Sequence, residues 1–83
     1  MFYVYLLCSI QHPEKLYVGY TSDLKRRFKE HNSDSHRHTS KYKPWKIIVY
    51  LGFADEANAL AFEKYLKTGS GRAFIKKKLI SQR

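Results

Sequence analysis

The segment FYVYLLCS at residues 2–9, followed after a polar turn by LYVGYTSDLKRRFKEHN at residues 16–32, decides the fold. In the first part, apolar or aromatic side chains occupy both alternating faces, so we expect a central strand that is covered on both sides. The turn around Pro13 leads to a second strand at about residues 15–20, paired most simply as an antiparallel hairpin. Gly19 interrupts that strand and indicates either a bulge or the close approach of a ligand or backbone.

A basic helix is predicted directly after the hairpin. Thr-Ser-Asp at residues 21–23 is typical of a helix start, and LKRRFKEH follows with good helix propensity. Leu24 and Phe28 lie four residues apart and should face the core. Arg27 and His31 lie four apart on a neighbouring stripe, so both side chains could point to one place beside the sheet.

Residues 32–43 are polar, basic and without periodicity, which predicts an exposed loop. His36 and His38 form an H-x-H pair that could bind a metal, although no third ligand is near in the sequence. Contact of this loop with phosphate is the preferred interpretation. The basic residues that we expect to contact nucleic acid are Arg26, Arg37, Lys41, Lys43 and Arg72.

The second half of the chain adds one strand and two helices. WKIIVYLGF at residues 45–53 predicts the third strand, and a helix capped by Asp55 should run to about Thr68, where Gly69 and Gly71 stop it. The expected buried stripe of this helix is Ala59, Phe62 and Leu66. A last basic helix follows at about residues 72–81. We therefore predict a small α+β domain over residues 1–83, with a three-stranded antiparallel sheet flanked by helices.

Composition favours a polyanionic partner. Sixteen Lys and Arg against seven Asp and Glu give 83 residues a formal charge of +9, which attracts nucleic acid. A solubility surface is the alternative, and the long amphipathic pattern of a membrane-surface helix is missing. Cys8 lies in an apolar strand and should be a reduced core residue. Without a recognisable signal peptide or spanning segment, we expect a soluble cytoplasmic protein.

Several side chains suit phosphodiester hydrolysis, which needs an activated water and a clamp on the developing charge. The guanidinium of Arg27 could be that clamp, since it fits phosphate with two hydrogen bonds. Tyr5 or Tyr17 could be a general base if nearby cations lower its pKa, and His31 could relay a proton. The alternatives are that the tyrosines only pack and that the arginine is solvated.

Glu63 is the most informative carboxylate. It falls at the margin of the buried stripe of its helix, where it could simply pair with Lys67 four residues on. It could also hold Mg²⁺, an ion that keeps most of its waters and needs only one or two protein oxygens.

The tripeptides Tyr3-Val4-Tyr5 and Tyr17-Val18-Gly19 resemble those that name the GIY-YIG nuclease family. TSDLKRRFKEHN is similar to the family's helix with an arginine and a histidine four residues apart, and ALAFEKYLKTGSGRAF resembles the segment with its metal-binding glutamate. The resemblance covers essentially the whole chain. It is strongest to the short stand-alone bacterial members, and extends to the nuclease module of the excinuclease incision subunit.

The resemblance implies a DNA endonuclease that uses one divalent ion, Mg²⁺ or Mn²⁺, and DNA repair or recombination is the expected process. It implies that Glu63 holds the metal and that Tyr17 activates or orients the attacking water. Arg27 would stabilise the phosphate, while Tyr5 and His31 would position substrate or relay protons. RNA stays open as a substrate, as does specificity through a protein partner or self-association.

Two departures from the family pattern stand out. Tyr3 replaces the usual first Gly, and we expect it to pack rather than catalyse. Residues 64–83 contain no Asn, although several members carry one after the glutamate. A non-catalytic nucleic-acid-binding module that keeps the fold is the main alternative, and a basic accessory subunit is another.

Overall fold

Three antiparallel strands form the sheet, with β1 (Phe2–Ser9) between β2 (Leu16–Thr21) and β3 (Trp45–Phe53). This computed structural model describes residues 1–33 and 37–80, with the backbone alone at residues 37 and 38. Because β1 is central, its polar backbone groups are paired on both sides, while β2 and β3 are edge strands. The predicted hairpin and the central position of its first strand are confirmed.

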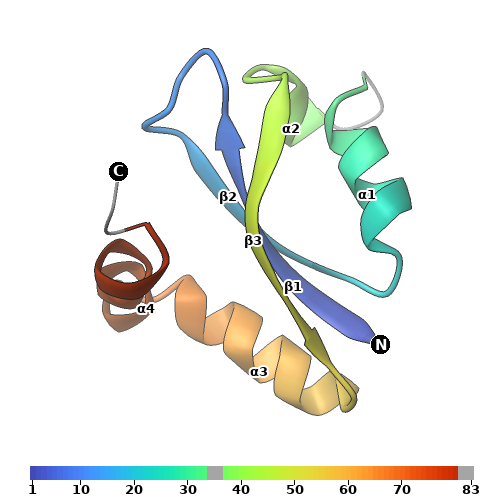
Figure 1. Cartoon of the computed structure of the whole chain (residues 1–83), viewed down its shortest axis with the longest axis vertical. Coiled ribbons are helices and arrows are strands. Elements are labelled where there is room, and N and C mark those ends of the chain that lie inside the picture. The colour runs from blue at the N-terminus through green and yellow to red at the C-terminus, as the bar shows by residue number, and fades with distance from the viewer. Residues whose placement is uncertain (34–36, 81–83) are drawn as a thin grey trace.

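Helices cover both faces of this sheet (Figure 1). The helical elements are α1 (Leu24–His31), α2 (Arg37–Ser40), α3 (Glu56–Leu66), α4 (Gly69–Phe74) and a π-helical turn, η1 (Ile75–Leu79). One face carries α1 and α2, and the opposite face carries α3 and α4. Within the described residues, no helix is both long and apolar enough to cross a membrane. The α+β architecture predicted from the sequence is confirmed.

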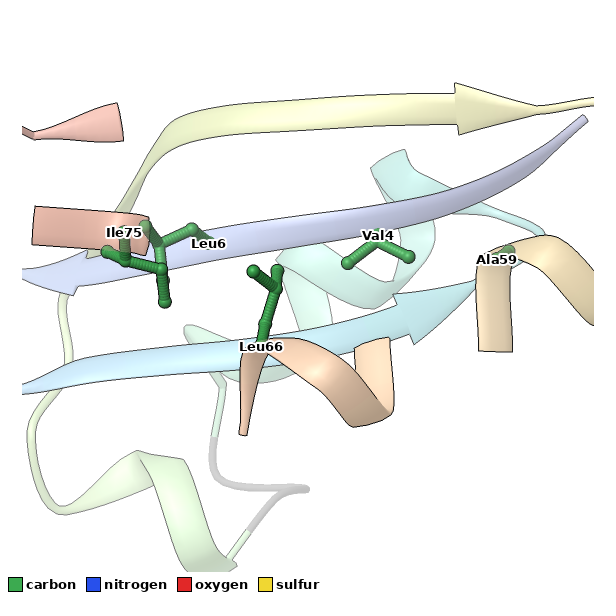
Figure 2. Packing of buried hydrophobic residues seen from close by; sticks show 5 residues of the cluster. All are labelled: Val4, Leu6, Ala59, Leu66 and Ile75. Carbon is green, nitrogen blue, oxygen red and sulfur yellow. The ribbon is translucent and has the colours of Figure 1, made fainter. Parts of the chain in front are cut away.

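The larger hydrophobic core lies between the sheet and α3, α4 and η1. Figure 2 shows its centre, where Val4 and Leu6 of β1 meet Ala59 and Leu66 of α3 and Ile75 of η1. All five side chains are buried. Burial of a Leu- or Ile-sized side chain stabilises a fold by about 1.5–3 kcal/mol, so these contacts hold α3 on the sheet. The alternation predicted for β1 and the stripe predicted for α3 are confirmed.

A second core lies on the α1 face and is richer in aromatic groups. Tyr5, Leu7 and Trp45 are its buried members, and Leu24 and Phe28 of α1 pack against them as predicted. The two alternating sets of β1 side chains therefore serve two separate cores. A buried histidine of α1, His31, joins the aromatic groups on this face.

The segment predicted as an exposed loop at residues 32–43 is partly folded inward, so that prediction is wrong in part. It contains the short helix α2, and Thr39 within it is only 2% exposed. Asn32 holds the start of β3 through two hydrogen bonds: its Nδ2 donates to Trp45 O (3.1 Å), and Trp45 N donates to its Oδ1 (2.6 Å). A polar segment can be buried when its backbone and side-chain groups form hydrogen bonds with other protein groups.

The end of α3 also differs from the prediction. Asp55 caps the helix as expected, through its Oδ1 and Ala57 N (2.8 Å), but α3 ends at Leu66 and the next helix begins at Gly69. Thr68 caps this second helix, since its Oγ1 accepts a hydrogen bond from Gly71 N (3.1 Å). Gly71 is therefore a helical residue where two helices meet, and is not the stop signal that the sequence suggested.

Alanine at Gly71 is expected to destabilise the fold, whereas alanine at Gly69 is not. A Cβ at Gly71 would lie 1.9 Å from Tyr65 O and 2.5 Å from Leu66 Cα, and backbone atoms cannot swing aside. We expect Gly71→Ala to lower the free energy of unfolding by about 3 kcal/mol or more. At Gly69 a Cβ meets nothing within 4 Å, so Gly69→Ala should stabilise by about 0.5–1 kcal/mol. Urea denaturation of both variants tests this, and equal effects would contradict it.

Candidate active site

The site is built around Tyr5, whose ring lies where a side chain at position 19 would otherwise be. Tyr5 pairs with Gly19 across the β1–β2 ladder. A Cβ on Gly19 would lie 2.3 Å from both Tyr5 Cζ and Tyr5 Oη. The register of β1 and β2 continues through this pair without a bulge. The close approach that the sequence allowed at Gly19 is therefore made by the Tyr5 ring.

His31 fixes the Tyr5 hydroxyl from the end of α1. Tyr5 Oη lies 2.8 Å from His31 Nε2, and Thr39 Oγ1 lies 2.9 Å from His31 Nδ1. All three side chains are buried. If Tyr5 donates to Nε2, then Nδ1–H donates to Thr39, and in the other tautomer both directions reverse. The network thus connects β1, α1 and α2 through one imidazole.

Tyr17 lies beside this network and is only partly buried. Its ring centroid is 4.8 Å from that of His31, 6.3 Å from that of Tyr5 and 6.5 Å from that of Trp45. Tilted aromatic pairs at such distances hold one another in place. The Tyr17 ring is therefore fixed on one side by buried groups, while part of it remains accessible.

Arg27 brings a positive charge to the same cluster. Its Nε lies 3.2 Å from Glu30 Oε1, and its side chain is one-third exposed. Burial raises the pKa of the Tyr5 phenol well above its ordinary value, and the charges of Tyr17 and Glu63 raise it further. Arg27 opposes this shift through its charge and its hydrogen bond but does not overcome it. The nearby cation lowers the pKa of Tyr5 as expected, but burial outweighs it and the net shift is upward.

The raised pKa predicts how stability changes at alkaline pH. A phenol whose pKa is higher in the folded chain adds stability below the unfolded value of about 10, and this stability is lost as the pH rises toward the folded value. When phenol ionisation is followed by absorbance as the pH is raised, part of the change should occur at a pH above that of ordinary tyrosines. Tyr5→Phe should reduce this part, whereas Tyr50→Phe, at an exposed position, should leave it intact. A Tyr5→Phe chain in which this part is unchanged would contradict the assignment.

Glu63 lies close enough to act on tyrosines of both strands of the hairpin. Its charge contributes to the raised pKa of Tyr5 and to that of Tyr20, where the main cause is the hydrogen bond that Tyr20 Oη donates to Glu56 Oε2 (2.5 Å). Lys67 Nζ donates to Glu63 Oε2 at 2.9 Å, so the ion pair expected from the sequence is confirmed. Glu63 lies on α3, on the face of the sheet opposite α1, and a long-range electrostatic effect connects its carboxylate to Tyr5.

The donor set around Glu63 fits a hard divalent ion. Its side chain is about one-fifth exposed, and its Oε2 accepts a hydrogen bond from Lys67 Nζ. No group of three or more His, Cys, Asp or Glu suited to a metal is found in the described part of the chain. Zn²⁺ sites need such a group, whereas Mg²⁺ and Mn²⁺ accept one carboxylate and complete their shell with water and phosphate oxygen.

The residues predicted to contact nucleic acid are spread over several elements. Arg26 is exposed on α1 and pairs loosely with Asp23 and Glu30, at 3.9 and 4.0 Å. Lys41 is exposed beside the Tyr42 ring, 5.5 Å from its centroid. Arg72 is exposed on α4, on the opposite face of the sheet.

The remaining predicted residues can be placed only in part. Lys43 is partly buried in the segment before β3. The H-x-H pair falls outside the described residues, since His36 is not described and the side chain of His38 is not either. The same applies to the Arg37 side chain.

Sequence reasoning missed Thr39 and the groups that hold it. Trp45 Nε1 donates to Thr39 O (2.7 Å), so the indole that fills the core also fixes the backbone next to His31. Asn32 in turn holds the Trp45 backbone. The His31–Asn32 dipeptide at the end of α1 was visible in the sequence. Its partners, separated by a polar stretch, were not.

Comparison with known proteins bears on this arrangement. The family model described as the GIY-YIG catalytic domain matches residues 1–78. A structure-specific endonuclease subunit SLX1 homolog of Drosophila mojavensis is 43% identical over 69 residues, which is 72% of this chain and 23% of that protein. The SLX1 subunit of Candida dubliniensis is 40% identical over 72 residues (77% and 25%), and the Giardia intestinalis homolog is 36% identical over 59 (66% and 16%).

The match with the family model covers nearly all of the chain, although the chain spans a quarter or less of the length of these three relatives. The matched region includes both strands of the hairpin, α1 and Glu63 of α3. The chain belongs to the GIY-YIG nuclease family.

Proposed function

We propose that the chain is a divalent-metal-dependent DNA endonuclease that hydrolyses phosphodiester bonds, in DNA repair or recombination. The observation that carries this is the convergence of Tyr5, Tyr17, Arg27 and His31 beside Gly19, with the charge of Glu63 acting on the same phenol. The relatives named as structure-specific endonuclease subunits support the reaction class. A chain this basic is suited to DNA, and we expect it to act in the cytoplasm.

Arg27 is the group that we assign to the phosphate. In the part of the chain that the structure describes, its buried Nε makes no well-aligned hydrogen bond and has only the ion pair with Glu30. A phosphate oxygen could therefore take the position of the carboxylate and gain a charge-assisted bond. The fixed guanidinium would stabilise the negative charge that develops on phosphorus oxygens in the transition state.

Tyr17 and Glu63 divide the remaining work. Glu63 would hold Mg²⁺ or Mn²⁺, which when bound polarises a phosphate oxygen and lowers the pKa of a water. Tyr17, partly exposed at the edge of the cluster, is the group positioned to orient or deprotonate the attacking water. The hydrogen bond between Tyr5 and His31 holds the neutral phenol and the imidazole in fixed positions. The raised pKa of Tyr5 supports a positioning role for its phenol.

Thr39 is a positioning residue in this scheme, because it reaches the site only through His31. Thr39→Val keeps the side-chain shape but removes the bond to His31 Nδ1, so we expect the cleavage rate to fall about tenfold with KM nearly unchanged. Thr39→Ser should restore the rate, and the pH profile of Thr39→Val should shift because the imidazole loses a partner. Equal rates for the valine and serine variants would contradict the role.

The test of the proposal is incubation with nicked, branched and single-stranded DNA, with matched RNA, in Mg²⁺, Mn²⁺ or chelator. Cleavage that requires a divalent ion is expected. Binding without cleavage under every condition would replace the nuclease by a nucleic-acid-binding module that keeps the fold. The relatives are named as subunits, so a protein partner or self-association could supply specificity. Measurement of the cleavage rate at increasing concentrations of the chain tests self-association.

A further inference from the structure

A groove of about 610 Å³ lies beside the proposed active site, on the face of the sheet opposite α1. It runs between the first half of β2 and the segment from the end of α3 to η1. Four cationic side chains line it: Lys15, Lys67, Arg72 and Lys76. Glu14 is the one acidic side chain in the lining, and it already faces His12 at 4.0 Å. The groove is therefore strongly cationic.

Two residues connect this groove to the site. Tyr17 lines the groove, and its ring centroid lies 4.8 Å from that of His31. Lys67 also lines the groove, and its Nζ donates to Glu63 Oε2 at 2.9 Å. If one phosphate of a nucleic-acid strand lies between Tyr17 and Glu63, the nucleotides next to it would therefore lie in this groove.

The walls of the groove are apolar as well as charged. Leu16, which is 36% exposed, contributes aliphatic surface between the cations, and the partly exposed Tyr17 contributes an aromatic ring. Double-stranded DNA presents phosphates and base edges, since its base faces are stacked inside the helix. Unpaired nucleotides present a flat base face together with the phosphate, and proteins bind them by stacking bases on aromatic side chains beside cations, as Tyr17 and the lysines of this groove would allow. The combination in this groove fits an unpaired strand better than a duplex.

We propose that this groove binds the unpaired nucleotides that adjoin the cleaved phosphate. The inference rests on the proposed function, since it places the cleaved phosphate at Tyr17 and Glu63. It makes the substrate a DNA with a single-stranded segment next to the cut. Lys67 is the link between the two parts, because it touches the proposed metal ligand and the groove together.

Fluorescence anisotropy with the full chain in chelator tests the charged wall without cleavage. The double variant Arg72→Glu/Lys76→Glu reverses two exposed groove charges, and Lys29→Glu/Lys46→Glu reverses two exposed charges on α1 and β3 as a matched control. We expect the groove variant to bind single-stranded DNA about tenfold more weakly than the control, with duplex binding about equal in the two. An equal loss for duplex and single strand would overturn the inference, because a general positive field would explain it.

A second measurement tests the apolar wall. An oligonucleotide with abasic residues keeps its phosphates but lacks base faces, so the intact chain should bind it more weakly than the normal strand. Leu16→Ser should reduce that difference, because the variant loses the surface that the bases contact. Equal binding of the abasic and normal strands by the intact chain would overturn the inference.

Cleavage assays separate this inference from the proposed function. If the intact chain cuts DNA but the groove variant binds single strands as the control does, the groove inference fails and the nuclease stands. If the intact chain cuts no DNA while the groove variant loses single-strand binding, the nuclease fails and the groove stands as a single-strand site.

Discussion

Glu63→Gln is expected to reduce DNA cleavage by about a thousandfold or more while the chain stays folded. The substitution keeps the size of the side chain and removes the negative charge that would hold the divalent ion. Glu63 is partly exposed and pairs with the exposed side chain of Lys67, so loss of its charge should cost little stability. Single-turnover cleavage in Mg²⁺ and in Mn²⁺, with thermal unfolding followed by circular dichroism, measures both effects.

The matched control for this variant is Glu56→Gln. Glu56 lies on the same helix, is exposed, and accepts the hydrogen bond of Tyr20 away from the aromatic cluster. We expect its cleavage rate to stay within about threefold of the original, since removing an exposed carboxylate changes only a weak surface interaction. Similar losses in the two variants would show that helix charge in general, and not a metal ligand, determines the rate.

Arg27→Ala should lower cleavage by about a thousandfold, because it removes the cation that faces the developing charge. Arg27→Lys keeps a positive charge without the planar pair of donors, so we expect it to recover only part of the rate. Single-turnover rates at saturating DNA distinguish a loss of transition-state stabilisation from a loss of binding.

Lys29→Ala is the control on the same helix. Lys29 is exposed on α1, and removing its charge should change the rate by no more than about threefold. Arg27→Ala also removes one of the ion pairs of Glu30, which lies 4.0 Å from Arg26 as well, so Arg27→Ala/Glu30→Ala should be as slow as the single variant. A faster double variant would mean that the altered Glu30 carboxylate, and not the loss of Arg27, was responsible for the defect.

The fold was largely predictable because each element has a periodicity of its own. The two alternating faces of β1 predicted a central strand between two cores, and Asp55 predicted the start of α3. The break between α3 and α4 was not predictable in detail. Gly71 could mean either a helix end or a close helix contact, and only the position of the Tyr65 carbonyl distinguishes them.

The candidate site was predictable as a set of residues but not as an arrangement. The spacing of Arg27 and His31 predicted that they point to one region, and both do lie beside Tyr5. The burial of the Tyr5 ring over Gly19 depends on strand register, which composition does not reveal. For that reason the sequence indicated the effect of a nearby cation on the pKa of Tyr5 but not the larger, opposite effect of burial.

The close approach at Gly71 has a consequence for how this nuclease can evolve. Backbone atoms of α3 closely approach the helix that carries Arg72 at Gly71, so main-chain contact fixes the spacing of the two helices at this point. Side chains along the groove can then change in charge and size while that spacing stays constant. Substrate preference could vary between related chains in this way while the position of Glu63 stays the same.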